Sequence, residues 1–121
     1  MIKSYNNIHN KIDTVINTYF KQCSIMMSTS QLAQSMQYIA NHGVNPLTNE
    51  RLISISKAKR TSSLMLTCGH YDASGDFAYK VGLPGKSEVG GGIVKKKKKK
   101  MAICVYSPKL NLQGNSLVGT I

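Results

Sequence analysis

The sequence predicts an α+β fold in which helices come first and an antiparallel sheet follows. Between residues 11 and 68, apolar residues recur at helical spacing in three stretches, each with residues typical of helix ends. After Gly69 the apolar period changes to two, and three short segments alternate apolar with polar residues. A run of helices followed by a run of strands is typical of an α+β domain with an antiparallel sheet.

The first predicted helix begins near Lys11, after residues 1–10, which we interpret as a connector or a truncated helix end. Asp13 lies in the first turn, where a carboxylate favours the positive end of the helix dipole. On periodicity alone, Tyr19 is interpreted as a core tyrosine. One face of the helix carries Ile12, Val15, Ile16, Tyr19, Phe20 and Cys23.

Two further helices are predicted from their start signals. Ser28 to Gln31 matches a capping box, and Gly43 is placed to be the C′ residue of the helix that follows. Asn45-Pro46 then forces a loop, and a third helix is expected from about Ser54 to Cys68. The apolar stripe of the second helix is Leu32, Met36, Ile39 and Ala40.

The third helix contains two Ser-x-x-Lys pairs, a spacing that puts a hydroxyl beside an amine on a helix. They are Ser54 with Lys57 and Ser56 with Lys59. Serines at a helix start are usually caps, and lysines in a basic run are usually solvated. We therefore interpret neither serine as a nucleophile.

The strands are expected after Gly69. Residues 77–81 place Phe77, Tyr79 and Val81 on one face of a first strand, and residues 83–85 form a turn. Residues 89–94 form the next strand, and residues 101–107 form the third, which Pro108 ends.

Residues 68–94 hold the most reactive side chains. Tyr71, Lys86 and Ser87 lie on either side of the predicted strand, and Gly90 to Gly92 mark a place where a side chain would obstruct a close approach. This pattern is typical of a substrate pocket at a sheet edge, and equally of a glycine-rich hairpin without a catalytic role. The residues alone leave both readings open.

Composition limits the class of protein. The length suits one modest domain or a piece of a larger one, and no apolar run is long enough to cross a membrane. The first residues lack the apolar core of a signal peptide, so a cytoplasmic location is expected. Cys23, Cys68 and Cys104 are odd in number and widely spaced, which argues against a disulfide framework and against zinc. We expect them to be reduced and buried.

The basic character is concentrated in one run. Of the formal net charge of +11, Lys95 to Lys100 supply six charges, and 11 − 6 leaves +5. This concentration argues against nucleic-acid binding, which favours a basic face spread over the fold. The run falls where two strands should meet, and adjacent like charges oppose strand pairing. It is either a patch for polyanions or anionic membranes, or, as we favour, a non-native replacement or a charge-tolerant loop tip.

Four segments resemble the C-terminal part of the serine-dependent glutaminase family, and together they cover most of the chain from residue 11 onward. The matching strings are TYFKQCSI (18–25), LAQSMQYIANHGVNPLTNERLIS (32–54), LTCGHYDASGDFAYKVGLPGKSEVGGGI (66–93) and MAICVYSPKLNLQGNSLVGT (101–120). The resemblance implies the β-lactamase-like, penicillin-recognising fold. It also implies hydrolysis of L-glutamine to L-glutamate and ammonia without metal or organic cofactor, and a homo-oligomer.

The resemblance also implies roles for single residues. Tyr19 and Tyr71 match the family's two substrate-binding tyrosines, and Tyr71 matches the proton-transfer partner of the catalytic serine. Val89 matches the residue whose backbone N–H binds the substrate. Lys86-Ser87 resembles the Lys-Ser/Thr-Gly motif of β-lactamase-like enzymes. Tyr19 is then expected to face a pocket, which reverses the interpretation from periodicity.

The sequence departs from the family pattern in three places. The family's Ser-x-x-Lys nucleophile lies upstream of the matched segments, so we expect residues 11–121 to be the C-terminal part of one glutaminase domain, inactive alone. Glu88 stands where the family has glycine, where a carboxylate would crowd the strand edge and repel the α-carboxylate of glutamine. The lysine run replaces a mostly apolar strand end and turn. The alternatives are a penicillin-recognising enzyme for another substrate, and a non-catalytic module whose lysines bind polyanions.

Overall fold

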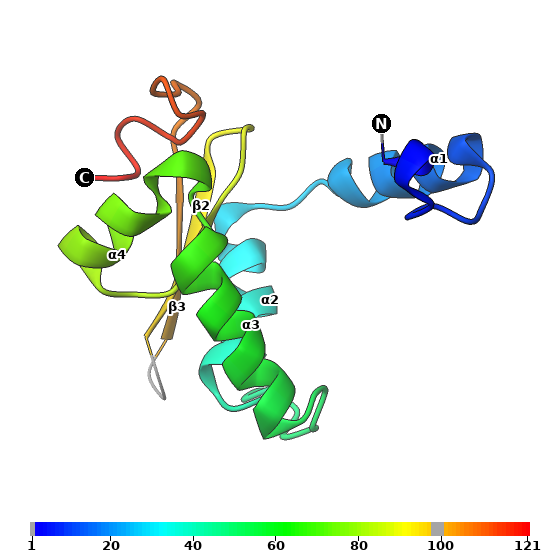
Figure 1. The fold of residues 1–121 in the computed structure, drawn as a ribbon. Coiled ribbons are helices and arrows are strands. Elements are labelled where there is room, and N and C mark those ends of the chain that lie inside the picture. The colour runs from blue at the N-terminus through cyan, green and yellow to red at the C-terminus, as the bar shows by residue number, and fades with distance from the viewer. Residues whose placement is uncertain (1, 98–100) are drawn as a thin grey trace.

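The computed structural model describes residues 2–97 and 101–121, and it has the predicted α+β architecture (Figure 1). The helices precede the sheet in the chain, which confirms the predicted fold class. Short 3-10 turns at Lys3–Tyr5 and Tyr71–Ala73 complete it. In order the elements are α1 (Ile12–Cys23), α2 (Thr29–Ala40), α3 (Ile55–Cys68), α4 (Ser74–Val81), β1 (Gly85–Ser87), β2 (Gly92–Lys97) and β3 (Met101–Tyr106).

The sheet is antiparallel in the order β1-β2-β3. Val94 on the central strand pairs with Lys86 of β1 and with Cys104 of β3, which fixes the register. Helix α2 contacts β2 and β3, while α3 contacts α2, α4 and β1. The core lies between these helices and the sheet, because apolar surface is buried there. Its buried apolar residues are Ile39, Ala40, Ala58, Met65, Phe77, Ile93 and Val94.

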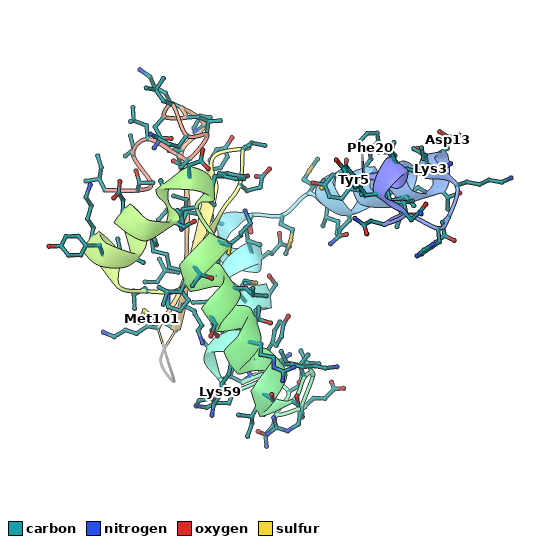
Figure 2. All side chains as sticks on the ribbon, in the orientation of Figure 1. Lys3, Tyr5, Asp13, Phe20, Lys59 and Met101 are labelled. Atoms are coloured by element: carbon teal, nitrogen blue, oxygen red, sulfur yellow. The ribbon has the colours of Figure 1, made fainter. Side chains whose placement is uncertain are left out.

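Helix α1 stands apart from this core. Figure 1 shows it at the end of an extended connection, and none of its residues is buried. Tyr19 is 62% exposed and Phe20, labelled in Figure 2, is 58% exposed. The amphipathic helix predicted from the pattern therefore forms, but its apolar face has no cover within the described chain. The interpretation of Tyr19 as a core residue is wrong for this structure.

The predicted caps of α2 and α3 are confirmed. The Ser28 hydroxyl accepts a hydrogen bond from the Gln31 N–H at 3.2 Å, and the Gln31 side chain accepts one from the Ser28 N–H at 2.9 Å. The Ser54 hydroxyl accepts from the Lys57 N–H at 3.2 Å, so Ser54 caps α3 as expected. Satisfying these otherwise unpaired N–H groups stabilises each helix by about 1 kcal/mol.

The end of α2 differs by one residue from the prediction. Its C-cap is Asn41, and the left-handed residue that follows directly is His42, with φ +57°. Gly43 comes one position later, with φ +89°, and its N–H donates to the Tyr38 carbonyl at 2.7 Å. Gly43 is required there because a Cβ would collide with the carbonyl of Ile53.

The prediction of a strand at residues 77–81 is wrong, because these residues belong to helix α4. Phe77 and Val81 are also four residues apart, which suits one helix face, and Tyr79 between them is 91% exposed. Asp76 lies in the first turn, and Gly82 ends the helix with φ +65°. A five-residue window of alternating residues cannot distinguish the two periods.

The strand predicted at residues 89–94 begins later, at Gly92, because residues 88–91 form the turn between β1 and β2. The Gly91 N–H donates to the Glu88 carbonyl, and the Glu88 N–H donates to the Gly92 carbonyl, both at 3.0 Å. Gly91 has φ +97°, and a Cβ there would collide with the Ser107 carbonyl. The third strand is confirmed as β3.

The expectation that the lysine run opposes strand pairing is wrong for its first half. Lys95, Lys96 and Lys97 continue β2 and pair with Ile103, Ala102 and Met101. Lys96 is buried, and the Lys95 ammonium lies 4.9 Å from the Phe77 ring centroid. Burial lowers the pKa of Lys95. Residues 98–100 lie outside the described part of the chain.

The cysteines are less buried than predicted. Cys23 and Cys68 are exposed and Cys104 is half-buried, and none of the three forms a disulfide. Burial raises the pKa of the Cys104 thiol. In residues 2–97 and 101–121, no helix has the length and apolar character needed to cross a bilayer.

The β1–β2 turn gives a test of this fold. Gly91→Ala should destabilise the protein by about 1–3 kcal/mol, because the left-handed backbone and the Ser107 carbonyl both oppose a side chain. Gly92→Ala is the matched control, since a Cβ at Gly92 meets nothing within 4 Å. Denaturant unfolding of both variants measures the difference, and equal stabilities would contradict the assigned turn.

Candidate functional site

Tyr71 occupies a strained turn between α3 and α4. Its φ of +51° lies in the left-handed region, which costs a non-glycine residue about 1–2 kcal/mol. The Ser74 hydroxyl holds this turn, because it donates to the Tyr71 carbonyl at 2.7 Å and accepts from the His70 N–H at 3.0 Å. The phenol is 44% exposed. Strain of this kind concentrates at functional sites.

Lys86 faces Tyr71 from the edge strand β1. Its ammonium lies 4.8 Å from the centroid of the Tyr71 ring, a cation–π contact, and it also donates to the Ser87 carbonyl. Burial lowers the pKa of Lys86, and the negative charge of Glu88 acts in the opposite direction. The two side chains that the sequence placed near a sheet edge are therefore in contact.

Ser87 points to the opposite face of β1 from Lys86. It is fully buried, and its hydroxyl has no hydrogen-bond partner in the described residues. Its N–H donates to the Gly69 carbonyl at 2.8 Å, which attaches β1 to the end of α3. The structure thus separates the predicted Lys-Ser pair. Lys86 faces the tyrosine, and Ser87 contributes to the position of the strand.

Val89 follows β1 in the turn at residues 88–91. Its side chain is 62% exposed, and its N–H donates to no other residue in the described part of the chain. Backbone N–H groups are strong donors that seek a partner. A free N–H in a turn held by two backbone hydrogen bonds is suited to bind a carbonyl oxygen of a ligand.

Tyr19 belongs to a different element but lies within electrostatic range of this turn. A hydrogen bond and the charge of Cys23 raise the pKa of Tyr19 most, and Tyr71 and Glu88 raise it further. A charge effect between Tyr19, Tyr71 and Glu88 requires these groups to be near one another. No hydrogen bond or ring contact joins the two predicted tyrosines in the described residues, and Tyr19 instead lines a smaller pocket on α1 with Thr14 and Thr18.

A cavity of about 670 Å³ reaches the β1–β2 turn at Glu88 and Gly92, but Tyr19, Tyr71, Lys86 and Val89 are not among its lining residues. It is formed by the end of α1, the start of α2, and the sheet. Cys23, Glu88, Gly92 and Tyr106 are among its lining residues. Most pockets for small molecules have this character, with an apolar lining and a few polar groups.

The two Ser-x-x-Lys pairs do not reach this site. Ser54 and Ser56 lie at the first turn of α3, and Tyr71 follows its last turn. A helix of 14 residues is about 21 Å long, so these serines are at the wrong end. Figure 2 shows Lys59 toward the end of α3 that lies away from α4.

Buried polar groups support the Tyr71 turn from behind, and sequence reasoning missed them. His70 is 1% exposed and stacks on Phe77 with ring centroids 3.6 Å apart. The Asn115 amide donates to the His70 carbonyl at 3.2 Å. Burial, followed by the charges of Lys95 and Lys86, lowers the pKa of His70 to about 4. No local pattern in the sequence signals this contact across 45 residues.

The neutral His70 predicts a loss of stability in acid. The unfolded side chain has a pKa of about 6.5, so between pH 6.5 and 4 the unfolded state binds the extra proton. Stability should be fully present above pH 6.5 and fall by up to about 3 kcal/mol as pH drops toward 4.

Denaturant unfolding at several pH values measures this loss of stability. In His70→Gln, the free energy of unfolding should no longer fall between pH 6.5 and 4. His9→Gln, at an exposed position, is the control and should retain this fall. A slope that survives in His70→Gln would assign the acid sensitivity to other groups.

Comparisons with known proteins identify the family of this chain. The family model described as glutaminase matches residues 1–121. A glutaminase from Aliarcobacter butzleri (strain RM4018) is 80% identical over 120 residues, covering 99% of this chain and 39% of that relative. A glutaminase from Ralstonia nicotianae is 52% identical over 118 residues, covering 98% of this chain and 39% of that relative.

Solved structures are similar over nearly the whole chain. The Bacillus subtilis glutaminase YbgJ, in a covalent complex with 5-oxo-L-norleucine, gives a TM-score of 0.91 at 35% identity. The match covers 98% of this chain and 43% of that one. A Bacillus glutaminase in 4.3 M NaCl gives a TM-score of 0.93 at 35% identity, covering 98% and 41%.

This chain spans about two fifths of the length of the curated relatives it matches. The family resemblance seen in the sequence is confirmed by the family match, by the relatives and by the solved structures. The chain belongs to the glutaminase family.

Proposed function

We propose that this chain supplies part of the active site of an enzyme that hydrolyses L-glutamine to L-glutamate and ammonia. The observation that carries the proposal is the strained Tyr71 turn, with its phenol ring beside Lys86 and within electrostatic range of Tyr19. The resemblance seen in the sequence implies the chemistry, a serine acyl-enzyme formed from the side-chain amide of glutamine with release of ammonia.

Each group has a proposed role in that reaction. A serine hydroxyl attacks the amide carbon and must lose its proton to a neighbouring base. Tyr71 is the proposed proton carrier, because the family resemblance gives it that role and its ring lies against the Lys86 ammonium. The free N–H of Val89 is proposed to bind the amide oxygen as it gains negative charge. Tyr19 contacts the substrate, while Lys86 and Ser87 support the arrangement.

The attacking serine is proposed to lie outside these 121 residues. Both Ser-x-x-Lys pairs of the chain are at the far end of α3, and Ser54 is already used as a helix cap. The uncovered apolar face of α1 is consistent with a further part of the protein packing there. A cytoplasmic location and a homo-oligomer belong to the same proposal, as family expectations.

The alternative of a polyanion-binding module is less well supported. Lys96 is buried and Lys95 lies against Phe77, so these two cations are not displayed on a solvated face. Binding of nucleic acid relies on accessible Lys and Arg side chains that replace counterions.

The role of Tyr71 can be measured in a chimera, in which this chain replaces the matching segment of the A. butzleri glutaminase. The 80% identity over that segment favours folding. Tyr71→Phe should lower kcat by about 100-fold or more, because the proton carrier is lost while the ring is kept. Ammonia release from L-glutamine is the readout.

Tyr79→Phe is the control in the same chimera, since Tyr79 is almost fully exposed on α4 and should keep its rate. Equal rates for the two variants would contradict the role given to Tyr71.

The isolated 121-residue chain should not sustain turnover of L-glutamine, because the nucleophile is absent. Ammonia release by the purified chain is compared with release by the chimera at equal concentration. Turnover by the isolated chain that disappears in Tyr71→Phe would show that it contains its own nucleophile.

A further inference from the structure

Glu88 places a negative charge beside the proposed donor for the substrate oxygen. It is directly before Val89 and is the first residue of the β1–β2 turn. Its N–H and carbonyl both make backbone hydrogen bonds at 3.0 Å, to Gly92 and Gly91. The backbone of Glu88 is therefore held in the same turn as the Val89 N–H.

The carboxylate folds back over the turn. Its Oε2 atom lies 2.6 Å from the place where a Cβ of Gly90 would be, so the carboxylate lies over Gly90. Glu88 also lines the cavity of about 670 Å³, together with Cys23 and Tyr106. The side chain is thus directed along the surface that a substrate must approach.

Two neighbouring groups respond to this charge. Glu88 is among the causes that raise the pKa of Tyr19, and it opposes the lowering of the pKa of Lys86. For Lys86, burial remains the larger cause. A fixed negative charge at such range acts on any other charge that forms there.

We propose that Glu88 slows the hydrolysis of the amide, because its carboxylate opposes the negative charge that develops on the amide oxygen near Val89. This inference rests on the proposed function. Hydrolysis of an amide creates that charge only on the way to the tetrahedral intermediate, so this effect lowers kcat, whereas the repulsion of the α-carboxylate of glutamine expected from the sequence would act on KM. Glu88 should not lower kcat for a substrate on which no negative charge develops near the Val89 N–H.

The test uses the chimera with the A. butzleri glutaminase and the variant Glu88→Gln, which removes the charge and keeps the shape. We expect kcat for L-glutamine to rise about ten-fold or more, with KM changed less than kcat. Added NaCl should raise kcat in the Glu88 chimera and have little effect on Glu88→Gln, because salt screens the carboxylate.

Glu50→Gln is the matched control. Glu50 is an exposed glutamate in the loop between α2 and α3, so this substitution removes the same charge at a distance from the site. Its kcat should equal that of the unmodified chimera. Thermal unfolding of all three proteins checks that folding is unchanged.

The outcomes separate the two claims. Turnover that Glu88→Gln leaves unchanged, or alters only through KM, overturns the role of Glu88 and leaves the proposed function in place. If the chimera is inactive both with and without the Glu88→Gln substitution while the A. butzleri parent is active, the proposed function is refuted, and this inference with it.

Discussion

The candidate site depends on the close approach of strand β1 to the end of helix α3. The Ser87 N–H reaches the Gly69 carbonyl at 2.8 Å, and a side chain on Gly69 would collide with the carbonyl of Gly85. A Cβ on Gly85 would in turn lie 2.9 Å from the His70 ring. Two glycines therefore allow a backbone contact that places the Tyr71 turn against Lys86 and orients the turn that carries Val89.

The strain at Tyr71 is sustained by the groups packed beneath it. His70 is stacked on Phe77 and held through its carbonyl by Asn115, and Ser74 bridges the turn with two hydrogen bonds. A left-handed tyrosine persists only where its surroundings fix it, and this network does so. The same burial keeps His70 neutral, which links the stability of the site to pH.

The sequence predicted the elements whose signals are local. Ser28 and Ser54 mark the starts of α2 and α3 because a cap acts within three residues of itself. The segment around Phe77 was assigned to a strand because a short alternating run fits both periods, and packing on His70 decides for the helix. Lys95 to Lys97 pair with β3 although lysine has a poor strand propensity. Their pairing depends on the register of β2 with β3, which no local signal gives.

The site residues illustrate the same limit. Periodicity predicts a core position for Tyr19, and only the family resemblance points Tyr19 and Val89 toward a pocket. The residues around Tyr71 allow a pocket or a plain hairpin until the resemblance favours the pocket. No pattern in the sequence gives the left-handed backbone of Tyr71, the unpaired N–H of Val89 or the contact of Asn115 with His70, because each arises from segments that meet only in the fold.

The central proposal is that Val89 and Tyr71 act on the same substrate atoms. The most direct measurement is a crystal structure of the A. butzleri chimera after reaction with 6-diazo-5-oxo-L-norleucine, the compound that forms the covalent complex of the Bacillus subtilis relative. The account predicts the ketone oxygen of the adduct at hydrogen-bonding distance from the Val89 N–H, with the Tyr71 hydroxyl beside the attacked carbon. An adduct bound away from both groups would contradict it.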